Sequence, residues 1–191
     1  MKPLFHFLVE PLGGKRYDNE LNLASGKKIT LSVSQEDYTV TQRIAVIREL
    51  PIDYTGPVKK GDMAVVHHNV FRKSFDQKGR EKSGSGDIGN GMYLVDPELI
   101  YMHKSFNQDE WKSVGPFIFI SPISNDDKIF DSSRLKQLYG IIEYSADSRL
   151  TRGSLVSFTP ESEYEFKIDS KLMYRMYEKN ITLIEYSCPK V

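Results

Sequence analysis

Short runs in which apolar and polar residues alternate follow one another along the whole chain. Residues 29–33 alternate between apolar and polar, a period of two that is typical of a β-strand with one buried face, and the apolar or β-rich runs at residues 5–10, 38–47, 92–95 and 99–103 are also predicted to be strands. Proline and glycine residues separate these runs, and no stretch has the period of a long amphipathic helix. The pattern therefore predicts an all-β protein.

One short phrase occurs twice, at residues 59–66 and again at residues 151–158. Each copy contains a polar pair, a glycine, a small polar residue and then an apolar run of residues that favour strands. Glycine suits a tight turn because it adopts positive φ without steric cost. We therefore expect Gly61, Asp62 and Gly153 to form structural turns that lead into buried strands.

The runs around this phrase also occur twice, in the same order. The matched ranges are 5–11 with 117–122, 43–47 with 140–144, and 92–101 with 173–183. The offset between copies falls along the chain from 111 residues to 92 and then 82, which indicates one motif in two versions, the second with shorter loops. The expected organisation is a first domain (1–104) with a polar hairpin insertion (72–91), a linker (105–115), and a second, shorter domain (116–191).

These elements resemble the chaperonin-10 (co-chaperonin) family, whose members cap the barrel-shaped chaperonins. The family opens with Pro-Leu before an apolar strand, as residues 3–4 do before residues 7–10. Its Val-Lys-x-Gly-Asp-x-Val phrase is matched by residues 58–66, and its closing strand, acidic turn and Ile-Leu strand by residues 93–100 and 174–183. As two copies, the resemblance covers nearly the whole chain, as in the tandem plastid form of the family.

The resemblance implies an all-β fold of two tandem GroES-like, partly open β-barrels, and a non-enzymatic function without a cofactor. Members form a ring-shaped lid that binds the apical surface of a GroEL-type chaperonin through a mobile loop and assists ATP-dependent protein folding. The loop would be residues 12–38, with Ile29, Thr30 and Leu31 as its docking tripeptide. The second copy has no clear tripeptide, so docking would belong to the first domain. The implied assembly is a homo-oligomer, with a heptamer matching the sevenfold chaperonin end.

Two questions stay open at the level of sequence. Residues 29–31 alternate cleanly, so they fit an ordinary strand as well as a docking loop. The same pair of barrels could also serve as a structural or interaction module, for instance in a virus particle, without binding a chaperonin. The divergence of the second copy suggests a phage-encoded protein, which would act in the host cytoplasm.

Charge and composition narrow the classes of partner. The chain has 26 basic and 26 acidic residues, which argues against duplex nucleic acid or an anionic membrane surface as the partner. Core packing explains Phe158, Tyr174 and Tyr177 better than stacking on single-stranded bases does. No run approaches the roughly 20 apolar residues of a membrane span. The single cysteine, Cys188, cannot form an internal disulfide, so a reducing cytoplasm is the expected location.

Two further motifs are predicted to have no chemical role. Residues 84–89 fit the GxGxxG pattern of dinucleotide-binding turns, but that mechanism needs a strand before and a helix after the glycines. Here a charged loop precedes the motif and a β-type run follows it. His67 and His68 fall in the strand expected to continue to about Phe71, where neighbouring side chains point to opposite faces. We therefore expect neither a nucleotide site nor a metal site.

Overall fold

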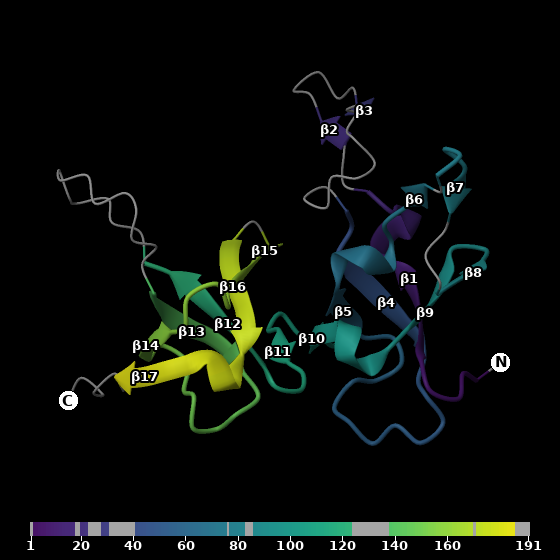
Figure 1. Ribbon diagram of the computed structural model, residues 1–191. Coiled ribbons are helices and arrows are strands. Elements are labelled where there is room, and N and C mark those ends of the chain that lie inside the picture. Colours follow the sequence, from purple (N-terminus) through teal and green to yellow (C-terminus); the bar gives the residue numbers. More distant parts are fainter. Residues whose placement is uncertain are drawn as a thin grey trace. The chain divides into compact units, whose positions relative to one another are not determined.

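The computed structural model describes residues 2–17, 20–22, 28–30, 41–75, 77–82, 86–123, 138–169 and 171–185. The chain divides into two compact units, residues 1–110 and 111–191 (Figure 1). Within the described residues, the secondary structure consists of β-strands and short 3-10 turns, without an α-helix. Each unit is built on an antiparallel sheet, so the prediction of an all-β fold is confirmed. No helix in the described ranges has the length and apolar character needed to cross a membrane.

The sheet of the first unit has the strand order β10-β5-β4-β1-β9-β8, and every neighbouring pair is antiparallel. The strands are β1 (Phe7–Pro11), β4 (Ile44–Glu49), β5 (Met63–Val66), β8 (Asp87–Gly89), β9 (Met92–Val95) and β10 (Ile100–Lys104). Alternate residues of β1 and β4 are buried, among them Phe7, Val9 and Ile47. This alternation follows from the two-residue period of a strand with one face on the core.

The second unit begins with the short strand β11 (Lys112–Ser113) and contains a six-stranded antiparallel sheet in the order β15-β16-β12-β13-β14-β17. Its strands are β12 (Phe117–Pro122), β13 (Tyr139–Ser145), β14 (Leu155–Phe158), β15 (Tyr164–Ile168), β16 (Lys171–Tyr177) and β17 (Ile181–Glu185). Residues 124–137, which precede β13, lie outside the described ranges.

The two sheets have the same strand order once equivalent strands are matched. Strands β10, β5, β4, β1, β9 and β8 take the places of β17, β14, β13, β12, β16 and β15. The irregularities also correspond, since the register of β1 on β4 shifts between Leu8 and Val9 and that of β12 on β13 shifts between Phe119 and Ile120. The repeat seen in the sequence is therefore present in the backbone pairing as well.

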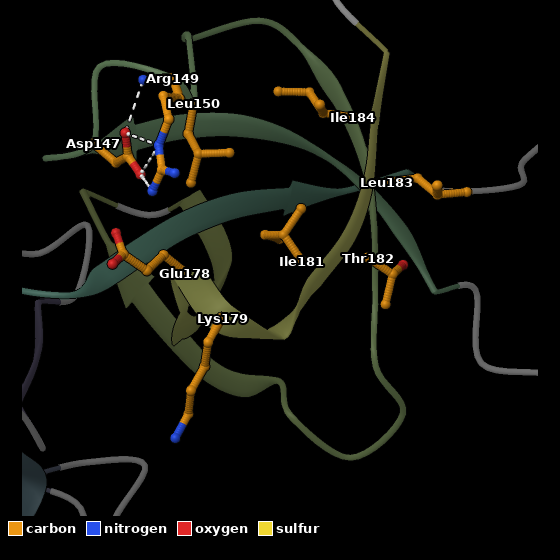
Figure 2. A pocket seen from close by; sticks show the side chains of 9 residues that line it. All are labelled: Asp147, Arg149, Leu150, Glu178, Lys179, Ile181, Thr182, Leu183 and Ile184. Carbon is orange, nitrogen blue, oxygen red and sulfur yellow. Dashed lines mark hydrogen bonds and ion pairs between the residues drawn. The ribbon is translucent and has the colours of Figure 1, made fainter.

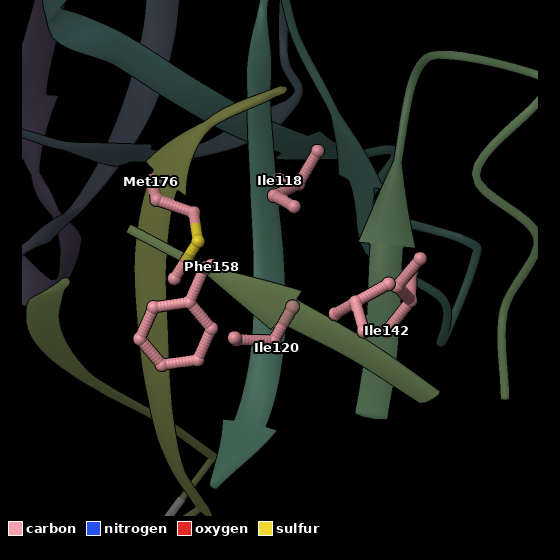
Figure 3. Close-up of a cluster of buried hydrophobic side chains, with 6 residues drawn as sticks. Ile118, Ile120, Ile142, Phe158 and Met176 are labelled. Atoms are coloured by element: carbon pink, nitrogen blue, oxygen red, sulfur yellow. The ribbon is translucent and has the colours of Figure 1, made fainter. Parts of the chain in front are cut away.

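The second unit contains a buried hydrophobic cluster that is formed by strands of its sheet. The buried cluster comprises Ile118, Ile120, Ile142, Val156, Phe158 and Met176. These residues belong to β12, β13, β14 and β16, and Figure 3 shows Ile118, Ile120, Ile142, Phe158 and Met176 gathered between the strands. Ile181 and Ile184 of β17 pack against the same cluster. Burying a side chain of this size contributes about 1.5–3 kcal/mol, so this cluster stabilises the unit together with buried residues outside it such as Phe119, Phe166 and Met173.

Two small hairpins are paired separately from the main sheets. The first joins β2 (Glu20–Asn22) to β3 (Lys28–Thr30), and the second joins β6 (Ser74–Phe75) to β7 (Glu81–Lys82). Residues 77–80 between β6 and β7 are exposed. The second hairpin lies within the insertion expected at residues 72–91.

The strand after Gly61 is shorter than the sequence predicts. It ends at Val66 and is followed by the 3-10 turn η3 (His68–Val70). The Nδ1 atom of His67 accepts a hydrogen bond from the backbone N–H of Asn69 at 3.0 Å, which caps this turn. A local side-chain bond of this kind competes with the strand ladder, so the expectation of a strand to about Phe71 is wrong.

Candidate functional site

The candidate chaperonin-binding residues lie between β1 and β4. Ile29 and Thr30 are in β3, where Ile29 lies opposite Leu21 of β2. Among the residues that the structure describes, β2 and β3 pair with each other in a two-stranded sheet of their own, so these residues lie on an excursion from the sheet of the first unit. Leu31, the third residue of the predicted tripeptide, lies outside the described residues.

The two ends of this excursion meet at its root. The chain leaves β1 through the turn η1 (Leu12–Gly14), and Tyr17 then forms an isolated antiparallel bridge with Thr41. The backbone N–H of Gln42 donates to the carbonyl oxygen of Arg16 at 2.9 Å. Because these contacts join residues 16–17 to residues 41–42, the segment between them is closed at its base and returns directly to β4.

Arg16 also connects this root to the residues that bound the 72–91 insertion. Its Nε donates to the carbonyl oxygen of Phe71 at 2.8 Å, and its Nη1 lies 3.6 Å from Oδ2 of Asp87. The guanidinium carbon lies 5.4 Å from the centre of the Tyr93 ring. The side chains of Arg16 and Asp87 are only 17% and 14% exposed, so this pair is largely shielded from water. Arg16 therefore connects the root of the excursion to the start of the insertion at Phe71 and to its end at Asp87.

A second contact strengthens the connection. The hydroxyl oxygen of Tyr17 accepts a hydrogen bond from the backbone N–H of Lys73 at 2.8 Å. Beside it, burial raises the pKa of the Tyr93 hydroxyl although Arg16 acts in the opposite direction, so this ring is neutral at physiological pH. We call Arg16 and Tyr17, with the groups that they bind, the root clamp.

The two glycine turns have the same backbone form. Gly61 and Gly153 have φ values of 89° and 86°. The N–H of Gly61 donates to Ile47, and the N–H of Gly153 donates to Ile142, in both cases to the carbonyl oxygen at 2.8 Å. A residue with a Cβ is strained at these φ values. Each glycine thus holds the end of one strand against the start of the next.

Asp62 has a larger role than that of a turn residue. Its carboxylate accepts hydrogen bonds from the backbone N–H of Lys59 at 2.9 Å and from the Ser105 hydroxyl at 3.0 Å. Nδ1 of His103 lies 2.9 Å from the same carboxylate, and both side chains are buried. Sequence reasoning missed this cluster because Asp62, in the turn before β5, and His103, in β10, are 41 residues apart in the sequence. In the second unit, Ser154 stands in the place of Asp62.

His67 and His68 are arranged differently from the prediction that they point to opposite faces. Their rings stack with centres 4.1 Å apart, because both residues have left the strand. Burial, together with the positive charges of His67, Arg43 and Arg72, lowers the pKa of His68 to about 4. No group of three metal-ligating side chains occurs in the described parts of the chain.

The glycine motif at residues 84–89 is followed by strands. Residues 83–85 lie outside the described ranges, whereas β8 begins at Asp87 and β9 follows it. The N–H of Leu94 donates to the carbonyl oxygen of Gly86 at 2.7 Å, which ties the described end of the motif to β9. Residues 86–95 therefore lack the helix N-terminus that would hold a pyrophosphate.

Of the three aromatic residues weighed for base stacking, two belong to the core. Phe158 is buried in the cluster of the second unit, and Tyr174 packs against that cluster. Tyr177 is 42% exposed, so for this residue core packing is the wrong explanation. Its ring lies 4.9 Å from that of Phe117 and 5.2 Å from Nζ of Lys179.

The second unit also has an open depression beside β17, with a volume of about 400 Å³. Its lining residues are Asp147, Arg149, Leu150, Glu178, Lys179, Ile181, Thr182, Leu183 and Ile184. Figure 2 shows Asp147 and Arg149 bound to each other at one side, and Leu183 directed away from the other lining side chains. The depression contains no pair of groups arranged for acid–base or nucleophilic chemistry.

No family model matches the chain, and no curated protein was found to match its sequence.

Proposed function

We propose that this protein is a co-chaperonin, a non-enzymatic lid that binds the apical surface of a chaperonin and assists ATP-dependent folding. The observation that carries the proposal is the position of the β2–β3 hairpin. It lies between the first two long strands of the first unit, outside the sheet, and contains Ile29 and Thr30. This is the place of the docking loop in the chaperonin-10 family, which the chain resembles.

The barrel architecture of that family is part of the proposal. Strands β16 and β17 are separated by three strands in the second sheet, and neighbouring strands lie about 4.8 Å apart. In a flat sheet, Met176 of β16 and Ile181 of β17 would be far from each other, yet both pack on one cluster. Strong curvature into a partly open barrel accounts for this shared core.

The energetics favour a multivalent lid. Burying an Ile or Leu side chain contributes about 1.5–3 kcal/mol, whereas ordering each residue of a loop costs about 1–2 kcal/mol. One tripeptide therefore binds weakly. Several copies in a homo-oligomeric ring, with a heptamer as the simplest match to a sevenfold partner, would bind tightly through avidity and still be released when the chaperonin changes state.

The test is the mass by light scattering after size exclusion, alone and with a GroEL-type chaperonin and nucleotide. We expect a ring that elutes with the chaperonin only when nucleotide is present. Ile29→Ser with Leu31→Ser should abolish co-elution without changing the ring mass. The matched control is Ile52→Ser with Leu172→Ser, two exposed apolar residues elsewhere, which should leave co-elution intact. A monomer, or a ring indifferent to chaperonin, would overturn the proposal.

The alternative is a structural or interaction module, for instance in a virus particle, that uses the same pair of barrels without a chaperonin. One observation favours it, since β3 is already paired with β2 in the free chain. Hydrogen exchange of residues 20–30 separates the two functions. Protection that appears only on a chaperonin ring favours the lid, and strong protection in the free chain favours the module.

A further inference from the structure

The 72–91 insertion has a place and a charge that the proposed docking of Ile29 to Leu31 does not explain. In Figure 1 the β6–β7 hairpin extends from the same end of the first unit as the β2–β3 hairpin. The root clamp explains this common direction. Arg16 and Tyr17, at the base of the first hairpin, bond to the backbone of Phe71 and Lys73 at the base of the second.

The clamp joins the base of the excursion that contains β2 and β3 to the base of the β6–β7 hairpin. It includes the shielded ion pair between Arg16 and Asp87, so it holds the insertion where the chain enters it and where it returns to β9. The two hairpins therefore start from one place in the first unit.

The second hairpin is basic. Residues 72–82 contain five basic and two acidic side chains. Lys78 and Arg80, between β6 and β7, are exposed. Over the whole stretch between β5 and β9, residues 67–91, there are five basic and three acidic residues, whereas the equivalent stretch between β14 and β16, residues 159–170, has four acidic residues and one basic residue. The positive charge is thus specific to the unit that has the hairpin with Ile29.

We propose that the β6–β7 hairpin is a second contact arm, which binds an acidic surface of the chaperonin next to the apolar groove that would accept Ile29 and Leu31. This inference rests on the proposed function and adds the chemistry of the partner surface. Charges at the rim of an interface act mainly on the association rate and on its salt dependence. The arm therefore guides the lid onto the chaperonin, and the apolar tripeptide then holds it there.

The test compares four proteins for binding to a purified GroEL-type chaperonin with nucleotide, by surface plasmon resonance at 0.05, 0.15 and 0.5 M salt. They are the natural chain, Lys78→Gln with Arg80→Gln, the charge-reversed Lys78→Glu with Arg80→Glu, and a control with Lys112→Gln and Lys167→Gln. The control removes two exposed basic residues from the second unit. Circular dichroism and ring mass check that each variant is assembled.

We expect Lys78→Gln with Arg80→Gln to weaken binding by about 3- to 10-fold at low salt, mostly through slower association. Charge reversal should weaken it further, and the control should bind as the natural chain does. At 0.5 M salt the differences should nearly vanish, because the screening length falls to a few ångströms, about 4 Å.

Three results would overturn the proposal, and they differ from one another. Unchanged affinity and salt dependence in both arm variants, with binding still lost in Ile29→Ser plus Leu31→Ser, rejects the arm and leaves the co-chaperonin function standing. A lower ring mass with unchanged chaperonin affinity per ring assigns the arm to contacts between copies of this chain. Absence of binding by the natural chain rejects the co-chaperonin function, and the arm with it.

Discussion

The two units repeat one backbone plan with different side-chain chemistry at equivalent positions. In the first unit, His6 forms an ion pair with Asp96 at 3.0 Å. At the equivalent place in the second unit, the rings of Phe117 and Tyr177 pack with centres 4.9 Å apart. Arg175 joins the aromatic pair, with its guanidinium carbon 5.0 Å from the Phe117 ring.

The neighbouring positions on the same face show the same divergence. The first unit has an ion pair between Glu10 and Arg48. In the second unit, the hydroxyl of Ser121 donates to Glu143 at 2.7 Å, and Lys171 also binds this carboxylate. Burial raises the pKa of Glu143, but the hydrogen bonds from Lys171 and Ser121 outweigh it and lower the pKa overall.

Comparison of the two units shows which features of the shared backbone are kept and which side-chain pairs vary. Strand order, the two bulged positions and the glycine turns agree, because they come from backbone hydrogen bonds and from a φ that only glycine adopts without strain. The outer pairs differ because a cross-strand pair contributes about 0.2–1 kcal/mol with either ionic or aromatic partners. The plan therefore tolerates exchange of these pairs.

The largest expected effect comes from the buried cluster around Asp62. Asp62→Ala should lower the unfolding free energy of the first unit by about 3 kcal/mol, because it leaves His103 and the N–H of Lys59 buried without their acceptor. Ser154→Ala, at the equivalent site, should cost about 1 kcal/mol in the second unit. Hydrogen exchange under increasing denaturant measures each unit through its own peptides. If Asp62→Ala and Ser154→Ala lowered the unfolding free energy equally, the contacts of Asp62 with His103 and Ser105 would add no stability beyond that of the turn.

Replacing the glycine in either turn should lower the unfolding free energy by a similar amount. Gly61→Ala and Gly153→Ala should each cost about 1–2 kcal/mol, because alanine is strained at these φ values. A Cβ at either position meets no atom within 4 Å, so steric contact adds nothing. The same exchange experiment measures both losses, with Gly79→Ala as a control for positive φ in an exposed turn. Costs that differ by more than about 1 kcal/mol would contradict the common plan.

The aromatic pair should contribute more than the ion pair. Tyr177→Ala should destabilise the second unit by about 1–2 kcal/mol, because Phe117 and Arg175 lose a packing partner. Asp96→Ala should cost the first unit at most about 0.5 kcal/mol, since its ion pair with His6 is exposed to water. The sole tryptophan, Trp111, is buried in the second unit, so its fluorescence follows unfolding there. A larger loss from Asp96→Ala would reverse this ranking.

A further effect is expected on the pH dependence of stability. The pKa of His68 is about 4 in the folded unit against an ordinary value of 6.5, so the unfolded state binds more protons between these values. The stability that this histidine provides is complete above about pH 6.5 and is lost as the pH falls toward 4. His68→Gln should therefore reduce the loss of stability of the first unit between pH 7 and pH 5. His6→Gln is the control, and a pH profile unchanged by His68→Gln would contradict the role of burial.

The sequence by itself determined the all-β class and predicted the repeat of the runs along the chain, whereas the order of the strands within each sheet came from the structure. The class and the repeat can both be seen without knowing the fold, because alternation of apolar residues is a local property and the repeat is visible in the order of the runs along the chain. It left the register open. The sequence match set residues 43–47 against 140–144, whereas in the structure Ile47 and Ile142 occupy equivalent places, each accepting from its glycine turn. A shift of two residues keeps every side chain on the same face, so the pattern alone cannot detect it.

Only the tertiary structure decided which distant side chains meet. His103 reaches Asp62 across 41 residues, and Arg16 reaches the carbonyl oxygen of Phe71 across 55. Neither pair has a spacing that a periodic pattern could reveal, because each depends on how strands and turns from separate parts of the chain are brought together. The placement of the β2–β3 hairpin outside the sheet is of the same kind, since a clean alternation at residues 29–31 fits a strand in either position.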